Sequence, residues 1–217
     1  MSLNVIFVRH GETLWHGENR YAGATDIDLT DHGRAQAAAL ADWAERARLS
    51  AVWSSPMLRC RQTAAGSAAR AGLPLRFDER LRELDFGVAE GLTRAEMRER
   101  MPDAVASFES DPVAHHFPGG EDPAAVAERY AAFLTDLRTG RGAGAEGDGP
   151  PPDGRILVVA HSTAIRLTLC RLFGLPLRDY RRVFPHLANC ALNELVVRDG
   201  TPSLLTLNRS VTPGDPA

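Results

Sequence analysis

Two arginines and two histidines are the side chains of this sequence best suited to bind an oxyanion. Arg9 and His10 are adjacent and directly follow an apolar run. Arg59 lies in the segment SSPMLRCRQTA, and His161 directly follows a second apolar run. Guanidinium groups bind phosphate oxygens in a bidentate manner, and histidine can donate hydrogen bonds or act as a nucleophile. If the fold brings these four side chains together, they would suit a dianionic group such as phosphate.

The two apolar runs predict the strands that must position these side chains. Residues 5–8 and 156–160 are rich in β-branched residues, which is typical of buried strands. Open α/β sheets hold their ligands at the carboxyl ends of parallel strands. We therefore expect Arg9, His10 and His161 at one edge of the sheet. The alternative for the first run is a strand that merely continues into a polar loop.

Helices and further strands alternate along the rest of the chain. The predicted helices and their start signals are residues 31–47 capped by Thr30, a helix beginning at Ser55-Pro56, 93–101 with a Thr93–Glu96 capping box, 103–108, a helix begun by Asp122-Pro123, and 163–173. Further strands are predicted at residues 51–53, 75–77, 191–197 and 203–208, the last two joined by a turn at Asp199-Gly200. This alternation predicts a three-layer α/β/α fold with a mostly parallel central sheet.

The composition is that of an ordinary globular protein, and we expect one domain over residues 1–217. Hydrophobic residues make up 44% and charged residues 24% of the 217 residues. The net charge of -3 argues against a nucleic-acid partner or an acidic membrane surface. No apolar run approaches the length of a membrane span. Residues 139–154 are predicted to be a flexible linker, and residues 212–217 a disordered tail.

Cysteine usage favours a reducing compartment. Cys60, Cys170 and Cys190 lie far apart and show no paired spacing. This pattern fits free thiols better than a disulfide framework or a zinc site. No basic segment leads into a long apolar one at the N-terminus, so no secretion signal is expected. A cytoplasmic protein is therefore predicted.

Four motifs, taken in their order along the chain, resemble the histidine phosphatase superfamily. RHGET follows the first predicted strand, SSPMLRCRQTA follows the second, LRELDFG lies in the middle, and VVAHS lies near the end. Each motif is weak alone, but together they span most of the chain. That superfamily groups phosphoglycerate mutases with many phosphomonoesterases, so the resemblance implies a phosphoglycerate mutase-like fold.

The resemblance also implies a role for each polar group. His10 would take the phosphoryl group onto a ring nitrogen as the nucleophile. Arg9, Arg59 and His161 would hold the oxygens of that group. Glu83 would protonate the leaving alkoxide and then activate water. No metal and no other cofactor is implied. The predicted substrate contacts, besides Arg9 and Arg59, are His16, Gly23, Ser162, His115 and His116.

The sequence departs from the family pattern at three places. His16 replaces an asparagine near the phosphate, Val88-Ala89 replaces an acidic residue and a tryptophan, and Ser162-Thr163 replaces two glycines. These changes alter phosphate contacts and the width of the pocket, but they remove no core catalytic group. Purely structural roles are the alternative for several of these residues: a surface ion pair of Arg9 with Glu12, a hydrogen-bonded core histidine at His161, an exposed helix charge at Arg59, and solvated loop positions for His115 and His116. For the acid, Glu79, Asp85 and Glu90 are close competitors of Glu83.

The function favoured by these observations is a phosphatase acting on a small phosphorylated metabolite. The segment between Glu83 and His161 is short and lacks the arginine pair and proline run that resembling mutases use on a substrate carboxylate. Mutase-type phosphoryl transfer is the main alternative. A metal-dependent hydrolase using His10, Glu83, Asp85 and His161 lacks the usual ligand spacing.

A non-catalytic phosphate-binding protein is also conceivable, although the retention of all five polar groups argues against it. The expected partner is a small-molecule phosphomonoester, and a homodimer is left open.

Overall fold

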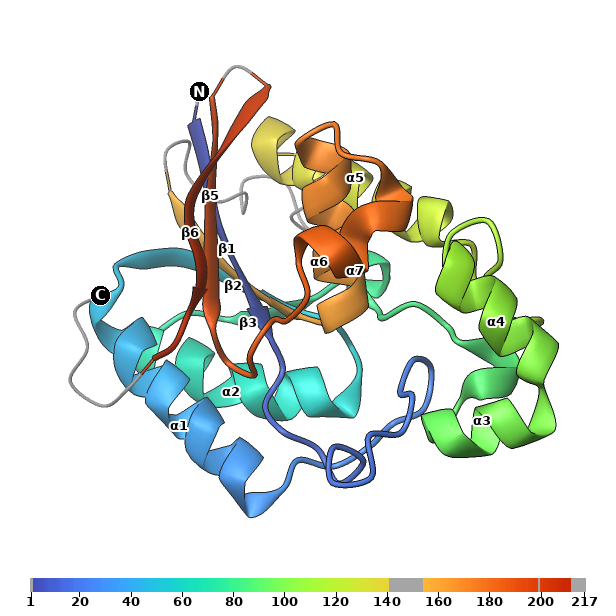
Figure 1. The fold of residues 1–217 in the computed structure, drawn as a ribbon. Coiled ribbons are helices and arrows are strands. Elements are labelled where there is room, and N and C mark those ends of the chain that lie inside the picture. Colours follow the sequence, from blue (N-terminus) through green and yellow to red (C-terminus); the bar gives the residue numbers. More distant parts are fainter. Residues whose placement is uncertain (1, 141–153, 199, 212–217) are drawn as a thin grey trace.

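A mixed β-sheet lies at the centre of the structure (Figure 1). The computed structural model describes residues 2–140, 154–198 and 200–211. Within these residues the sheet has six strands, in the spatial order β3-β2-β4-β1-β5-β6. The strands are β1 (Ser2–Arg9), β2 (Leu49–Ser54), β3 (Leu75–Phe77), β4 (Arg155–Ala160), β5 (Leu192–Arg198) and β6 (Thr201–Arg209). The pairs β3–β2, β2–β4 and β4–β1 are parallel, whereas β1–β5 and β5–β6 are antiparallel. The predicted mostly parallel sheet is confirmed.

Helices cover both faces of this sheet. They are α1 (Asp31–Arg46), α2 (Leu58–Ala71), α3 (Arg94–Arg100), α4 (Pro102–Ser110), α5 (Pro123–Thr139), α6 (Ser162–Leu172) and α7 (Tyr180–Val183). Short 3-10 turns occupy Glu79–Leu81, Gly87–Ala89 and Leu177–Asp179. Helices α1 and α2 pack on one face and α5 and α6 on the other, while α3 and α4 lie to one side (Figure 1). The three-layer α/β/α arrangement is therefore confirmed.

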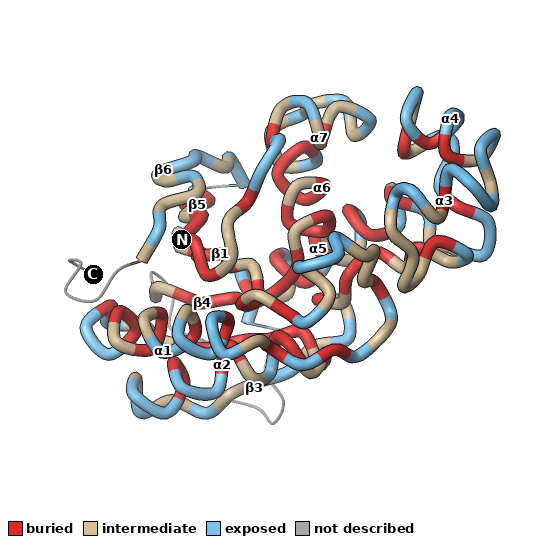
Figure 2. The backbone as a smooth tube through the Cα atoms, turned by 60° about the horizontal axis from the view of Figure 1, so that its bottom comes forward, coloured by how far each residue is buried: buried red, intermediate tan, exposed pale blue. Residues whose placement is uncertain are grey.

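Strand β1 is buried on both faces, as its continuous apolar run predicts. Val5 and Phe7 belong to the core beneath α5 and α6, while Ile6 and Val8 belong to the core beneath α1 and α2. This division follows from the alternation of side chains along a strand. Figure 2 shows the buried backbone of β1 and β4 between the two helical layers. Because β1 is buried on both sides, the segment of the chain that leads into Arg9 and His10 is rigid.

Most of the predicted helix starts are confirmed. The Thr30 side chain accepts a hydrogen bond from the backbone of Gly33 at the start of α1, and the capping box of Thr93 and Glu96 is present at α3. Asp122 caps α5. The predicted start of the second helix was wrong by two residues, because α2 begins at Leu58 with Met57 as its N-cap.

The predicted linker and tail fall largely outside the described residues. Thr139 is the last residue of α5 and Gly140 its C-cap, whereas residues 141–153 and 212–217 are not described. Strands β5 and β6 form the predicted hairpin, although Asp199 in its turn is not described. In the described part of the chain, no helix combines the length and apolarity needed to cross a membrane.

Candidate active site

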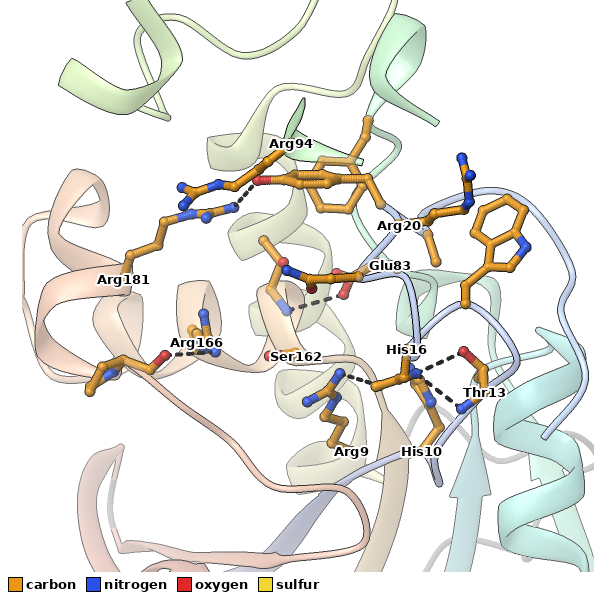
Figure 3. Close-up of a pocket in the computed structure, with 17 residues that line it drawn as sticks. Arg9, His10, Thr13, His16, Arg20, Glu83, Arg94, Ser162, Arg166 and Arg181 are labelled. Carbon is orange, nitrogen blue, oxygen red and sulfur yellow. Dashed lines mark hydrogen bonds between the residues drawn. The ribbon is translucent and has the colours of Figure 1, made fainter. Parts of the chain in front are cut away.

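A cavity of about 340 Å³ opens where β1 and β4 end (Figure 3). Arg9 is the last residue of β1, and His10 follows it directly. Ser162 begins α6 immediately after His161, the residue that follows β4. The cavity is lined by Arg9, His10, Thr13, Trp15, His16, Asn19, Arg20, Tyr21, Ala22, Glu83, Phe86, Arg94, Ser162, Thr163, Arg166, Arg181 and Pro185. The two apolar strands thus bring polar groups from distant parts of the chain to one edge of the sheet.

His10 presents an unprotonated ring nitrogen in this cavity. Its Nδ1 lies 2.8 Å from the carbonyl oxygen of Gly11, and a carbonyl only accepts, so Nδ1 carries the proton. Nε2 is then the nitrogen with a free lone pair. Burial, together with the charges of Arg59 and Arg9, holds the pKa of His10 well below its usual range. The ring is therefore neutral at pH 7, as a nucleophile must be.

His16 holds the guanidinium of Arg9. Its Nε2 lies 2.7 Å from Arg9 Nη2, and because arginine only donates, Nε2 accepts. Nδ1 lies 3.0 Å from the backbone nitrogen of Thr13, which donates to it, and 2.9 Å from Thr13 Oγ1. Burial and the charge of Arg9 lower the pKa of His16 to about 4, so the ring stays neutral. Arg9 Nη1 also donates to the carbonyl of Leu187 at 2.9 Å. Arg9 is thus fixed by two acceptors, rather than paired with Glu12.

Glu83 is held at the start of helix α6. Its carboxylate accepts hydrogen bonds from the backbone N–H groups of Leu84 (2.9 Å), Thr163 (3.1 Å) and Ala164 (2.9 Å). Burial raises the pKa of Glu83 above its usual value, and these donors partly oppose that shift. A carboxyl group that keeps its proton to higher pH is suited to act as a general acid.

The acids that compete with Glu83 in the sequence have other positions. Glu90 accepts from the backbone of Gly23, Ala24 and Phe86. Asp85 accepts from the backbone of Gly87 at 2.8 Å. Among the described residues that line the cavity with His10, Glu83 is the one carboxylic acid.

Arg59 and His161 lie behind the cavity, and both are completely buried. Arg59 Nε donates to His161 Nδ1 at 3.2 Å. Its Nη1 donates to the carbonyl of Thr25 (2.8 Å), and its Nη2 donates to the carbonyls of Gly23 (2.9 Å) and Ala22 (3.3 Å). Arg59 is therefore not an exposed helix charge. The His161 ring packs edge-on against His10, with the ring centroids 5.4 Å apart. Both residues are close to the candidate nucleophile but do not line the cavity.

The predicted substrate contacts divide into two groups. His16 and Ser162 line the cavity, whereas Gly23, His115 and His116 do not. Gly23 donates its backbone N–H to Glu90 at 2.8 Å, and a Cβ there would collide with the Glu90 carboxylate and the Leu84 carbonyl. Its lack of a side chain serves close packing beneath the cavity. His115 and His116 are exposed in the turn after α4, which matches the solvated alternative.

Four cavity arginines were not selected from the sequence: Arg20, Arg94, Arg166 and Arg181. Arg94 begins α3, Arg166 lies in α6 and Arg181 lies in α7. Arg166 stands four residues after Ser162, so helical spacing places both on one face of α6 and could have revealed it. Arg94 and Arg181 are far apart in sequence, and no local signal links them. In the fold both line the same cavity, Arg94 from α3 and Arg181 from α7.

A metal site is not evident in the described part of the chain. There, no group of three or more His, Cys, Asp and Glu side chains is arranged to hold a metal ion. The carboxylate of Glu83 faces backbone N–H donors, and Arg59 donates to His161. The polar groups are instead arranged around arginine, which is the arrangement expected for an anionic ligand.

These features define a class of α/β protein in which a buried neutral histidine faces an arginine-lined cavity at the carboxyl edge of a parallel sheet. The chain matches the family model of the histidine phosphatase superfamily (branch 1) over residues 5–210, and it belongs to that family. The resemblance expected from the four motifs is therefore confirmed.

Several relatives in this family bear phosphatase or mutase names. The chain is 30% identical over 178 residues to phosphoserine phosphatase 1 of Hydrogenobacter thermophilus, covering 82% of this chain and 80% of that protein. It is 32% identical over 193 residues to the probable phosphoglycerate mutase GpmB of Escherichia coli O1:K1, covering 89% and 84%. The structure of a mycobacterial glucosyl-3-phosphoglycerate phosphatase superposes with a TM-score of 0.84 at 27% identity, covering 97% of this chain and 100% of that one. The family and these similarities support a phosphatase enzyme.

Proposed function

We propose that this protein is a phosphomonoesterase that hydrolyses a small phosphorylated metabolite through a phosphohistidine on His10. The observation that carries the proposal is the protonation state of His10. Its Nδ1 proton is committed to Gly11, which leaves the Nε2 lone pair free beside an arginine-lined cavity. The phosphatase names of the relatives from Hydrogenobacter and mycobacteria add support.

In the first step, His10 Nε2 attacks phosphorus and the bond from phosphorus to the leaving oxygen breaks. Glu83 donates its proton to that oxygen, so the product leaves as an alcohol. Arg9 and the N–H at the start of α6 stabilise the charge on the phosphoryl oxygens. Forming a covalent intermediate divides one difficult displacement into two easier ones.

In the second step, water attacks the phosphohistidine. The Glu83 carboxylate takes a proton from this water, the bond from nitrogen to phosphorus breaks, and inorganic phosphate leaves. His10 returns to its neutral form and Glu83 to its acid form, which completes the cycle. One carboxyl group serves both steps because each step leaves it in the state that the other requires.

Arg59 and His161 support this chemistry from behind the nucleophile. The positive charge of Arg59 disfavours a proton on His10 and so keeps Nε2 available. His161 packs against the His10 ring and limits its rotation. A direct contact with the phosphoryl group would require either side chain to turn towards the cavity, and the variant Arg59→Met separates that role from support of His10.

Mutase-type transfer is the second candidate, because of the similarity to the E. coli protein named as a probable phosphoglycerate mutase. The test begins with a phosphate-release screen over sugar phosphates, phosphoglycerates, nucleotides and phosphorylated cofactors. Phosphorus NMR of the enzyme with 3-phosphoglycerate then compares release of phosphate with isomerisation. We expect hydrolysis without isomerisation. Rapid interconversion of phosphoglycerates with almost no release of phosphate would establish the mutase instead.

A further inference from the structure

Three arginines face the cavity with their hydrogen bonds directed to neutral acceptors. Arg9 donates to a carbonyl and to the neutral ring of His16. Arg166 donates to the Pro185 carbonyl at 3.2 Å. Arg181 donates to the hydroxyls of Tyr180 (2.9 Å) and Tyr21 (3.4 Å). Neutral acceptors take up some of the N–H groups of these arginines but leave their positive charges uncompensated.

These charges also act on one another across the cavity. Burial and the charge of Arg166 lower the pKa of Arg9 to about 10, and burial and the charge of Arg181 lower the pKa of Arg166. The Nε atoms of Arg9 and Arg166 are buried and have no hydrogen-bond partner. The sole acid among the described cavity residues is Glu83, which the proposed first step requires in its neutral form. The cavity therefore has more positive charge than a single phosphoryl group at His10 would neutralise.

Arg181 is held in place away from His10 by aromatic rings. Its guanidinium lies 4.9 Å from the ring centroid of Phe108 and 5.9 Å from that of Tyr21. Because the Tyr21 hydroxyl accepts from Arg181, its own proton remains available to a ligand. This aromatic support fixes the guanidinium before any ligand binds, which reduces the entropy cost of binding.

Arg94 approaches the same end of the cavity. It lies 3.5 Å from Glu109, whose carboxylate is also shared with Arg98 at 2.9 Å. Glu109 is the neighbour of Phe108 in α4, so residues adjacent in one helix contact Arg94 and Arg181. In Figure 3 both arginines extend towards this side of the cavity, on the opposite side of Glu83 from His10. Two guanidinium groups and one hydroxyl thus converge.

We propose that the substrate carries a second anionic group, bound by Arg181, Arg94 and the Tyr21 hydroxyl, in addition to the phosphoryl group at His10. This inference rests on the proposed function for the placement of the phosphoryl group. Arginine binds a carboxylate or a phosphate through the same paired hydrogen bonds. The substrate class is therefore a small phosphomonoester that also bears a carboxylate or a second phosphate.

Stable phosphonates test this subsite without any turnover. Calorimetry measures the binding of propylphosphonate, of 3-phosphonopropionate, which adds a carboxylate, and of propane-1,3-bisphosphonate, which adds a second phosphonate. We expect at least one doubly anionic compound to bind about tenfold more tightly than propylphosphonate. The compound with the greater gain identifies the second group. Equal affinity for all three would overturn the proposal.

The variant Arg181→Gln assigns the effect to its residue. It should reduce the preference for the doubly anionic compound to about onefold, while propylphosphonate binding changes by less than about threefold. The matched control is Arg182→Gln, the exposed neighbour in α7 that pairs with Asp179, and it should keep the full preference. If Arg181→Gln fails to fold, as judged by its thermal transition, the same preference is measured in Arg94→Gln. A preference that survives in both folded variants would contradict the assignment.

Kinetics separate this inference from the proposed phosphatase activity. The specificity constant, kcat/KM, is compared for 3-phosphoglycerate and glycerol 3-phosphate, which differ by one carboxylate. A higher kcat/KM for the acid, lost in Arg181→Gln, supports the subsite. Equal values for both with rapid release of phosphate would overturn the subsite and leave the phosphatase intact. No release from any phosphomonoester, with the phosphonate preference retained, would refute the phosphatase and support the subsite.

Discussion

Arg59 donates a hydrogen bond from Nε to Nδ1 of His161 over 3.2 Å, and neither side chain reaches solvent. Since arginine only donates, this bond places the single proton of the neutral His161 ring on Nε2. Ser55 Oγ, 2.8 Å from Nε2, accepts that proton. The resulting chain from Arg59 through His161 to Ser55 forms a rigid wall behind His10.

Arg59 should contribute strongly to stability as well as to activity. In Arg59→Met, the carbonyls of Ala22, Gly23 and Thr25 lose a buried donor. We expect the free energy of unfolding, measured in urea, to fall by about 3 kcal/mol. Arg61→Met, at an exposed position of the same helix, should change it by less than about 0.5 kcal/mol. If Arg59→Met were inactive yet as stable as this control, direct contact with substrate would be the main role of Arg59.

Gly23 should tolerate no side chain, although it does not line the cavity. In Gly23→Ala, the new methyl group would meet the Glu90 carboxylate and the Leu84 carbonyl. We expect a loss of about 2 kcal/mol in the free energy of unfolding, because this segment cannot move without disturbing the acceptors of Arg59. Gly17→Ala is the matched control, since a Cβ there meets nothing within 4 Å. Equal thermal transitions for the two variants would show that the segment around Gly23 shifts at little cost to make room for the methyl group.

Stability should decrease as the pH falls below about 6.5, the unfolded pKa of histidine. Burial lowers the folded-state pKa values of His10, His16 and His161, that of His16 to about 4. At a pH between the folded-state and unfolded-state pKa values of such a histidine, the unfolded chain binds a proton there and the folded protein does not. Acid therefore favours unfolding. Urea titrations from pH 7 to pH 5 should show this decline. His16→Asn should reduce the slope of the free energy of unfolding against pH by up to about 1 kcal/mol per pH unit, after allowance for solvent screening. An unchanged slope would mean that His16 titrates normally.

Glu83 should set the alkaline limb of the pH–rate profile. Its protonated form is needed to release an alkoxide, and burial raises its pKa above the usual carboxyl value. For alkyl phosphates, kcat/KM should therefore fall as the pH rises through that raised pKa. Glu83→Gln cannot ionise, so this limb should disappear while the remaining activity drops by about 100-fold or more. A variant that kept the alkaline limb would assign it to another group.

The sequence was most informative where structure depends on neighbours along the chain. The apolar runs around Phe7 and Val158, the cap at Thr30 and the capping box at Thr93 are local signals, and each element formed as predicted. The order of the four motifs likewise identified the family. These features depend on strand burial and backbone capping, which a few adjacent residues determine.

The sequence was less informative where distant segments meet. Ser55 resembled a helix cap, but its hydroxyl is close to His161, and α2 begins only at Leu58. Arg59 could not be recognised as buried, because its acceptors lie more than thirty residues earlier in the chain. Arg94 and Arg181 come together only in the folded cavity. Such contacts depend on tertiary packing and leave no periodic signal in the sequence.

The central claim is that His10 Nε2 becomes phosphorylated during turnover, and trapping that intermediate tests it most directly. In Glu83→Gln with 4-nitrophenyl phosphate, the good leaving group needs little acid catalysis, whereas attack by water lacks its base. We predict a burst of one nitrophenolate per protein and, by mass spectrometry of the protein quenched at alkaline pH, one phosphoryl group on the peptide at His10. Adding His10→Ala should abolish both signals. A phosphoryl group on another residue, or phosphate release by His10→Ala alone at the wild-type rate, would contradict the account.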